Sequence, residues 1–380
     1  MTVSACWRRL ACVAAAAVLA GCGGGGSAHA PAPARAPASL PDLSPAQLAG
    51  QRVIYSYQGL TPPAGLLDLI RHGEAAGVIF FGGNLASTSQ ISGVIAQLDQ
   101  ANASSDNPLR TLPLLLMTDQ EGGLVRRLPG PPELSEKQIG ASADPSAEAT
   151  EAGTGAGQTL ARVGMNVNLA PVLDVYRAPG DFDDRFGRSY SSDPGAVSAL
   201  GADFITAQQA VGVAATAKHF PGLGAAISAQ NTDEQPVTLN VSRDDLRGID
   251  EYPFRAAIAA GVKLVMVSWA VYPALDPRWP AGLSPAIIGG ELRQRLGFTG
   301  VTITDALEAG ALQAFGSTGP RATLAVSAGM DLILCSSQDL DQGDQARTAL
   351  QQGLTSGTLN HAAFIAAVER IMNLRSSLRR

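Results

Sequence analysis

Residues 112–118 read LPLLLMT, and residues 119–123, which follow directly, read DQEGG. A short, continuously apolar run is typical of a strand that is buried on both faces, as in a parallel sheet covered by helices. Asp119 and Glu121 come directly after this run. In α/β barrels the carboxyl ends of the strands carry the functional groups. The stretch therefore predicts both a buried strand and the place where a site begins.

The same pattern recurs along the chain and predicts eight strands with helical segments between them. Strict alternation of strand and helix indicates one parallel sheet, and a count of eight indicates closure. We therefore predict an α/β protein with a single (β/α)8 TIM-type barrel at residues 43–380; an open, doubly wound sheet is the alternative. The predicted strands are 52–57, 77–81, 112–118, 166–169, 214–218, 263–268, 301–304 and 332–335. The predicted helices are 64–76, 87–102, 146–163, 193–211, 243–260, 285–296, 319–328 and 361–377.

The N-terminal segment predicts export. Residues 1–21 combine the basic pair Arg8-Arg9 with an apolar stretch too short to cross a membrane, as a signal peptide does. They end in Leu-Ala-Gly before Cys22, which resembles a bacterial lipobox. We expect a lipid on Cys22 and a flexible Gly/Ala/Pro tether at residues 22–42, so that the protein is anchored to the outer face of a bacterial cell membrane. An apolar leader with a chance cysteine is the alternative.

The composition is that of a globular protein and argues against several functions. With 46% hydrophobic and 16% charged residues the chain can form a large core, and its net charge of −6 argues against nucleic acid as a partner. Only Cys335 remains beyond Cys22, so no disulfide framework is expected. No residues have the spacing of a metal site, and Gly122-Gly123 lacks the Lys-Ser/Thr of a phosphate loop. We expect neither metal nor cofactor, and a monomer.

Polar residues follow most of the predicted strands directly, and a barrel brings its strand ends together at one mouth. We therefore expect a cleft lined by charged side chains. In chain order, these positions are Gly82-Gly83-Asn84, Asp119 to Gly123, Asn168 and Asp174, Lys218-His219, Ser268-Trp269, and Asp305.

Several of these segments resemble the glycoside hydrolases of family 3. The similar blocks occur in the family's order over residues 77–334, and the branch they resemble most is the single-domain β-N-acetylglucosaminidases (β-hexosaminidases). We expect that branch because no second α/β domain is read after the barrel. The blocks are TDQEGG at 118–123 with Arg127, NLAPVLD at 168–174, GRSY at 187–190, KHFPG at 218–222, TDAL at 304–307 and AGMD at 328–331.

The resemblance implies an exo-acting, retaining β-glycosidase. Its substrates would be cell-wall fragments that contain N-acetylglucosamine, as in peptidoglycan turnover; another β-linked sugar is the alternative. Asp305 matches the nucleophile, which forms a covalent glycosyl-enzyme. Asp119, Lys218 and His219 match residues that bind sugar hydroxyls.

Other residues in these blocks carry weaker expectations. Arg127 and Arg188 match residues that contact the sugar, although a surface ion pair is the alternative for both. We expect Asp174 to hold neighbouring loops through hydrogen bonds, and Glu121 and Asp331 to be buried structural carboxylates.

The general acid is where the chain departs from the family. In this branch a histidine, with an aspartate two residues before it, protonates the leaving group from a loop after the fifth strand. Here that loop, residues 224–236, reads GAAISAQNTDEQP and holds no histidine. Asp233 or Glu234 is our tentative acid/base, with a pKa raised by burial. The alternative is that both are solvated loop charges with no part in catalysis. In that case activity would be limited to good leaving groups, or turnover would be lost.

Trp269 and the missing histidine bear on how the site works and on two other functions. Trp269 follows the sixth strand and is expected to stack on a sugar face, with core packing as the alternative. The missing histidine favours a lipid-anchored carbohydrate-binding protein with weak or no catalysis, whereas the retained Asp305 argues for an enzyme. A solute-binding lipoprotein would share the anchor but would have two lobes instead of eight βα units.

Overall fold

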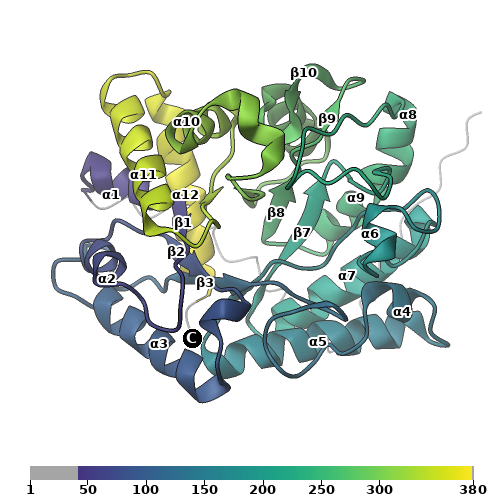
Figure 1. Cartoon of the computed structure of the whole chain (residues 1–380), viewed down its shortest axis with the longest axis horizontal. Coiled ribbons are helices and arrows are strands. Elements are labelled where there is room, and N and C mark those ends of the chain that lie inside the picture. The colour runs from purple at the N-terminus through teal and green to yellow at the C-terminus, as the bar shows by residue number, and fades with distance from the viewer. Residues whose placement is uncertain (1–41, 379–380) are drawn as a thin grey trace, which may run out of the picture. The chain divides into compact units, whose positions relative to one another are not determined.

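Eight parallel strands form the central sheet of the computed structural model, which describes residues 42–378 (Figure 1). The first and last strands in this order meet through a parallel bridge between Ile303 and Leu332, so the sheet closes into a barrel. The predicted (β/α)8 fold is therefore confirmed, and the open sheet is excluded. In sheet order the strands are β11 (Val301–Thr304), β8 (Leu264–Val267), β7 (Ala214–Phe220), β6 (Val167–Asn168), β3 (Leu115–Thr118), β2 (Gly77–Ile79), β1 (Val53–Tyr55) and β12 (Ile333–Leu334).

All eight strands lie where the apolar runs predict them, within a few residues. Alternate side chains of each strand point to opposite faces. Ile54 therefore packs inside the barrel, whereas its neighbours Val53 and Tyr55 pack outward against the helices. Helix α12 (His361–Ser377) adds Ile371 and Leu374 to the inner cluster. The core thus consists of a barrel interior and a surrounding layer between sheet and helices.

The helices surround the sheet, and most begin at a side-chain cap. Asp144 caps α5 (Pro145–Val163), and Gly164 ends it with a left-handed φ of 100°. Both are standard boundary signals of a helix. The other α-helices are α1 (Pro45–Gly50), α2 (Ala64–Arg71), α3 (Thr88–Asn102), α4 (Glu136–Gly140), α6 (Phe182–Arg185), α7 (Pro194–Ala210), α8 (Arg243–Asp245), α9 (Tyr252–Ala259), α10 (Thr318–Ala328) and α11 (Leu340–Thr355). None of the helices within 42–378 has the length and apolar character needed to cross a membrane.

Two predicted helices have a different geometry. The segment predicted at 243–260 consists of α8, the π-helical η2 (Leu246–Asp250) and α9. Pro253 cannot donate a backbone hydrogen bond, so a regular helix cannot run through it. The segment predicted at 285–296 is the π-helix η4 (Ala286–Arg295).

The loops at the carboxyl ends of the strands carry additional small elements. A hairpin of β4 (Gln120–Gly122) and β5 (Val125–Arg126) follows β3, and a second of β9 (Val271–Tyr272) and β10 (Asp276–Pro280) follows β8. Short 3-10 turns occur at η1 (Gly82–Asn84), η3 (Ala281–Leu283) and η5 (Gly310–Phe315). These loops surround the mouth of the barrel.

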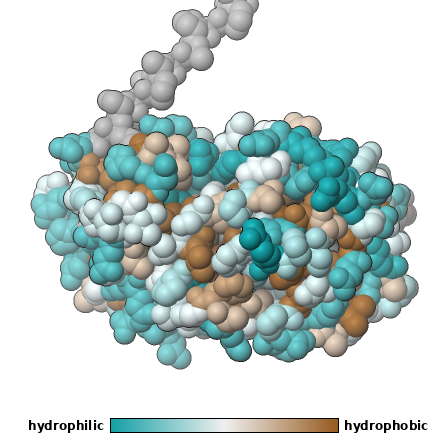
Figure 2. Space-filling model, turned by 90° about the horizontal axis from the view of Figure 1, so that it is seen from above, coloured by the Kyte–Doolittle hydropathy of each residue, from teal (hydrophilic) through white to brown (hydrophobic). Residues whose placement is uncertain are grey.

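The predicted signal peptide, Cys22 and nearly all of the tether lie outside the described residues. Cys335 is buried and unpaired, as expected of a small core residue. The face of the molecule in Figure 2 is mostly hydrophilic, with hydrophobic residues in small separate patches. Within 42–378 the large hydrophobic side chains that are exposed are Leu60, Leu124, Leu134, Phe186, Ile227 and Tyr252.

Candidate active site

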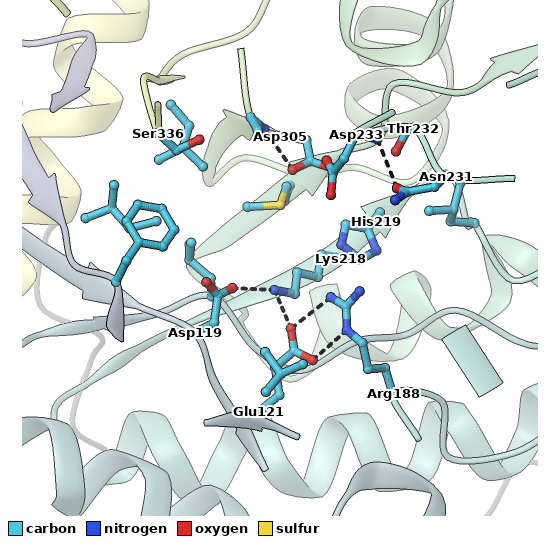
Figure 3. Close-up of a pocket in the computed structure, with 18 of the residues that line it drawn as sticks. Asp119, Glu121, Arg188, Lys218, His219, Asn231, Thr232, Asp233, Asp305 and Ser336 are labelled. Atoms are coloured by element: carbon cyan, nitrogen blue, oxygen red, sulfur yellow. Dashed lines mark hydrogen bonds and ion pairs between the residues drawn. The ribbon is translucent and has the colours of Figure 1, made fainter. Parts of the chain in front are cut away.

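A cavity of about 240 Å³ opens at the carboxyl ends of the strands. Its polar lining comes from segments far apart in the sequence, which only closure of the barrel brings together (Figure 3). Seven of the predicted site residues line it: Asp119, Arg127, Arg188, Lys218, His219, Asp233 and Asp305. The predicted convergence of polar strand ends at one mouth is therefore observed.

The hairpin after β3 brings Asp119 and Arg127 to the same side of the cavity. Asp119 follows the last residue of β3, and the hairpin folds the chain back so that Arg127 lines the same cavity. Its turn needs glycine, because Gly122 has a φ of 117° and a Cβ there would lie 2.2 Å from the carbonyl oxygen of Leu134. Asp119 and Arg127 face each other with 4.0 Å between Oδ2 and Nη2.

A buried network of charges forms the floor. The Nζ atom of Lys218 lies 2.8 Å from Asp119 Oδ1 and 2.6 Å from Glu121 Oε1. Glu121 also accepts two hydrogen bonds from Arg188, at 2.8 Å from Nε and 2.9 Å from Nη2. Burial alone would raise the pKa of Glu121, but Arg188 and Lys218 outweigh it and hold this pKa well below its usual range. Asp119 and Glu121 likewise outweigh burial at Lys218 and raise its pKa, so the ammonium stays charged.

Asp174 orients His219. The Nδ1 atom of His219 lies 2.7 Å from Asp174 Oδ2, and Asp174 Oδ1 accepts the backbone N–H groups of His219 and Leu223. Asp174 thus holds the loop after β7, as predicted. Although burial lowers the pKa of His219, Asp174 raises it by more. The protonated form of His219 is therefore favoured, and in that form its outer nitrogen, Nε2, is a hydrogen-bond donor.

Asp183 lies behind these residues and completes the one group among the described residues with metal-ligand chemistry. Ligand atoms of Asp174, Asp183 and His219 all lie within 4.8 Å of one another. The hydrogen bonds just described occupy both oxygens of Asp174 and one nitrogen of His219, which leaves too few ligands for a closed ion site. Burial, together with the nearby Asp174, raises the pKa of Asp183 to about 7 against the opposing effect of Arg188.

Asp305 and Asp233 lie side by side across the cavity from the floor (Figure 3). Asp305 follows β11, and its Oδ1 accepts the backbone N–H of Ala306 at 2.8 Å. Desolvation at the wall of the cavity and the negative charge of Asp305 raise the pKa of Asp233 to about 6, although the residue as a whole is exposed. A carboxyl group that is half-protonated near pH 6 is suited to proton transfer in both directions.

Two predicted residues do not line the cavity. Glu234 is exposed, does not belong to the lining, and accepts a hydrogen bond from the side chain of Asn231. The prediction that Trp269 stacks on a sugar is corrected: its ring is fully buried against Gly282, and its Nε1 donates to the carbonyl oxygen of Ala306 at 2.8 Å. Core packing, the alternative, describes its environment.

Sequence reasoning missed several lining residues. Glu121, expected to be only structural, is buried but also lines the cavity, as do Asn231 and Ser336. The sequence did contain a signal for Glu121. It stands two residues after Asp119, and residues two apart in an extended strand point to the same face. Asp331, in contrast, is the buried structural carboxylate that was predicted, and it bonds to Arg293 and Arg370.

Comparison with known proteins gives concordant matches. The model of the glycosyl hydrolase family 3 N terminal domain matches residues 51–374. An uncharacterized secreted glycosyl hydrolase of Arthroderma benhamiae is 45% identical over 343 residues, covering 90% of this chain and 96% of that protein. A beta-hexosaminidase of Stenotrophomonas maltophilia is 35% identical over 312 residues, covering 80% and 87%. The structure of a glycoside hydrolase family 3 beta-N-acetylglucosaminidase from Paenibacillus sp. matches with a TM-score of 0.83 and 36% identity, covering 88% of this chain and 63% of that one.

Proposed function

Because this chain belongs to glycosyl hydrolase family 3, we propose that it is a retaining β-N-acetylglucosaminidase in which Asp305 is the nucleophile and Asp233 the acid/base. The observation that carries the proposal is the pair of carboxylates on one wall of a cavity whose other wall is a cluster of hydroxyl-binding groups. Retaining glycosidases need two carboxyl-type groups at the scissile bond, one to attack and one to transfer protons.

The reaction follows from this arrangement in two steps. The carboxylate of Asp305 attacks the anomeric carbon and forms an ester, while the glycosidic bond breaks and its oxygen takes the proton of Asp233. Asp233 then removes a proton from water, and the water oxygen attacks the anomeric carbon and releases Asp305 as a carboxylate. Esterification removes the negative charge that raises the pKa of Asp233. The pKa of Asp233 therefore falls when its role changes from acid to base.

The charged residues across the cavity from Asp305 and Asp233 support binding of a single terminal sugar. Asp119 offers carboxylate acceptors, and Lys218, Arg127, Arg188 and the outer nitrogen of His219 offer donors. The cavity volume of about 240 Å³ is below the range of about 300–1,000 Å³ typical of sites for larger ligands, which favours exo action. We therefore propose hydrolysis from the non-reducing end of the chain.

The cellular setting is proposed from the sequence. The segment before Cys22 and the tether support export and lipid anchoring to the outer face of a bacterial membrane, where N-acetylglucosamine-containing cell-wall fragments are the substrates. The Arthroderma relative, which is described as secreted, supports export. We propose that the domain acts as a monomer without a cofactor.

The test compares aryl β-N-acetylglucosaminide with aryl β-glucoside as control, using wild type and Asp305→Ala. We expect turnover of the N-acetylated substrate by wild type, with loss of activity in the variant. A second measurement is mass spectrometry of the quenched Asp233→Asn enzyme, in which slow hydrolysis of the ester lets the intermediate accumulate. A sugar attached to the peptide that contains Asp305 is the expected result. No turnover of either substrate, or inversion at the anomeric carbon, would refute the proposed mechanism.

A further inference from the structure

The segment that carries Asp233 lies directly on the loop that follows Asp305. The backbone N–H of Gly310 donates to the carbonyl oxygen of Asp233 at 2.7 Å, and that of Ala311 donates to the carbonyl oxygen of Thr232 at 3.0 Å. Both donors stand at the start of η5, a few residues after Asp305. Thr232 is buried at this contact, with 3% of its surface exposed. The two carboxylates are thus joined through a short path of backbone.

Only glycine fits at position 310. A Cβ there would lie 2.2 Å from the carbonyl oxygen of Glu234, 2.3 Å from its carbonyl carbon and 2.9 Å from the nitrogen of Gln235. Atoms this close must move apart, and these are backbone atoms that cannot rotate away as the end of a side chain can. Any larger residue at 310 therefore displaces the segment around Asp233.

Each partner in this contact has hydrogen bonds of its own that hold its backbone. On one side, Asn231 closes a compact turn, because its side chain accepts the N–H of Asp233 at 3.0 Å and its carbonyl accepts the N–H of Gln235 at 3.0 Å. On the other side, Trp269 Nε1 holds the carbonyl of Ala306 at 2.8 Å. Buried Trp269 thus supports the loop after the nucleophile without facing the cavity. The contact at Gly310 therefore connects two hydrogen-bonded segments, one carrying Asp233 and one following Asp305.

We propose that Gly310 is a positioning residue that sets where Asp233 stands relative to Asp305, and that the bare backbone of Gly310 is required for proton transfer to the leaving group. This inference rests on the proposed role of Asp233 as the acid. Gly310 contacts none of the reacting atoms and acts only through the backbone of residues 232–235, the segment that carries Asp233. Misplacement of a catalytic group by about 1 Å costs on the order of 10²-fold in rate.

The experiment compares kcat/KM of Gly310→Ala on two substrates that differ in leaving group. An alkyl β-N-acetylglucosaminide needs protonation of the departing oxygen, whereas a dinitrophenyl β-N-acetylglucosaminide leaves as a stable anion. We expect Gly310→Ala to lower kcat/KM on the order of 10²-fold for the alkyl substrate and to leave the dinitrophenyl value nearly unchanged. The matched control is Gly93→Ala in α3, where a Cβ meets no atom within 4 Å, and both substrates should react as with wild type.

A second variant guards against a folding defect. Ala311→Pro keeps the bare backbone of Gly310 but replaces the N–H donated to Thr232 by the ring Cδ, which points at the same carbonyl oxygen, and proline is tolerated in the first turn of a helix. It should show the same dependence on leaving group. Equal losses on both substrates in Gly310→Ala, with an unchanged melting temperature, or no loss on either, would overturn the positioning role.

Asp233→Asn, measured in parallel, separates the two proposals. If it lowers both substrates equally or neither, the acid assignment itself is wrong. If it impairs only the alkyl substrate while Gly310→Ala impairs neither, the proposed function stands and the role of Gly310 is refuted.

Discussion

At the scale of single residues, the site depends on charges that change each other's protonation. Desolvation at the cavity wall raises the pKa of Asp233 most, and Asp305 and Glu308 also raise it, whereas His219 and Arg188 lower it. In the proposed mechanism this carboxyl group takes the place of a histidine, because its pKa of about 6 is close to that of an imidazole. Desolvation at the cavity wall and the neighbouring carboxylate of Asp305 together suit Asp233 to this task.

The first prediction concerns how kcat/KM depends on pH when Asp233 is the proton donor. Catalysis of an alkyl substrate needs protonated Asp233, so kcat/KM is expected to fall above pH about 6, by about tenfold per pH unit. The fall should be absent with a dinitrophenyl substrate and in Asp233→Asn. Glu234→Gln is the matched control, since Glu234 lies outside the cavity lining, and its profile should match that of wild type. A profile of Asp233→Asn that still falls above pH 6 would assign the acid elsewhere.

The second prediction concerns the floor of the cavity. Glu121→Gln keeps the shape of the side chain but leaves Lys218 and Arg188 close together without their shared counter-ion. Breaking a buried ion pair on one side costs about 3–5 kcal/mol, so we expect a clearly lower free energy of unfolding in urea and a raised KM.

Glu133→Gln is the control for this variant. The ion pair of Glu133 with Arg126 is long, at 3.8 Å, and the Glu133 side chain is 79% exposed. Its free energy of unfolding should stay within about 0.5 kcal/mol of wild type. A similar loss of stability in both variants would contradict the role given to Glu121.

How far the site could be predicted also becomes clear at this scale. Asp119 and Asp305 directly follow strands, and Lys218 lies in the last residues of β7, so closure of the barrel brings all three to one mouth. Trp269 comes at a strand end too, but its ring turns beneath Gly282. The position of a residue after a strand predicts at which end of the barrel it lies. The direction of its side chain depends on the local backbone conformation, which the hydrophobic periodicity of the sequence does not predict.

At the scale of elements, strands were predicted better than helices. A buried parallel strand is marked by its apolar composition alone, whereas a helix is recognised by an apolar stripe. Helix α11 was missed because its buried positions include Gln342, Gly343 and Gly353, which do not form such a stripe. Its start signal was present, since Asp339 caps the helix by accepting the N–H of Asp341. Glycines in α11 are there for packing, because Tyr55 lies against Gly343.

The third prediction tests that packing. Alanine is a better helix former than glycine by about 1 kcal/mol. If helix propensity alone set the stability of α11, Gly343→Ala would therefore raise the free energy of unfolding. A Cβ at 343 would lie 2.2 Å from the ring of Tyr55, and overpacking of this kind costs about 1–3 kcal/mol. We therefore expect Gly343→Ala to lower the free energy of unfolding and Gly93→Ala, in open space, to raise it slightly. Stabilisation by both substitutions would show that Tyr55 moves aside freely.

At the scale of the whole domain, the buried carboxyl groups give the protein a preferred pH. Burial raises the pKa of Asp183 to about 7, and it does the same for Asp250 against the opposing effect of Arg177. The folded protein therefore holds protons on these groups between pH about 4, where the unfolded carboxyl groups release theirs, and pH about 7. His219, with its raised pKa, likewise holds a proton longer when folded.

The fourth prediction follows from the sign of this difference. Stability changes with pH in proportion to the protons bound by the unfolded state minus those bound by the folded state. Here the folded state binds more, so the free energy of unfolding must decrease as pH rises from about 5 to about 8. We expect a melting temperature lower by a few degrees at pH 8 than at pH 5, measured at constant ionic strength. In Asp250→Asn, which cannot ionise, the decrease should be smaller; an equal or larger decrease would show that Asp250 is already ionised at pH 5. Stability and proton delivery by Asp233 would then share one optimum on the acid side of neutrality, because both depend on carboxyl groups that the barrel keeps protonated.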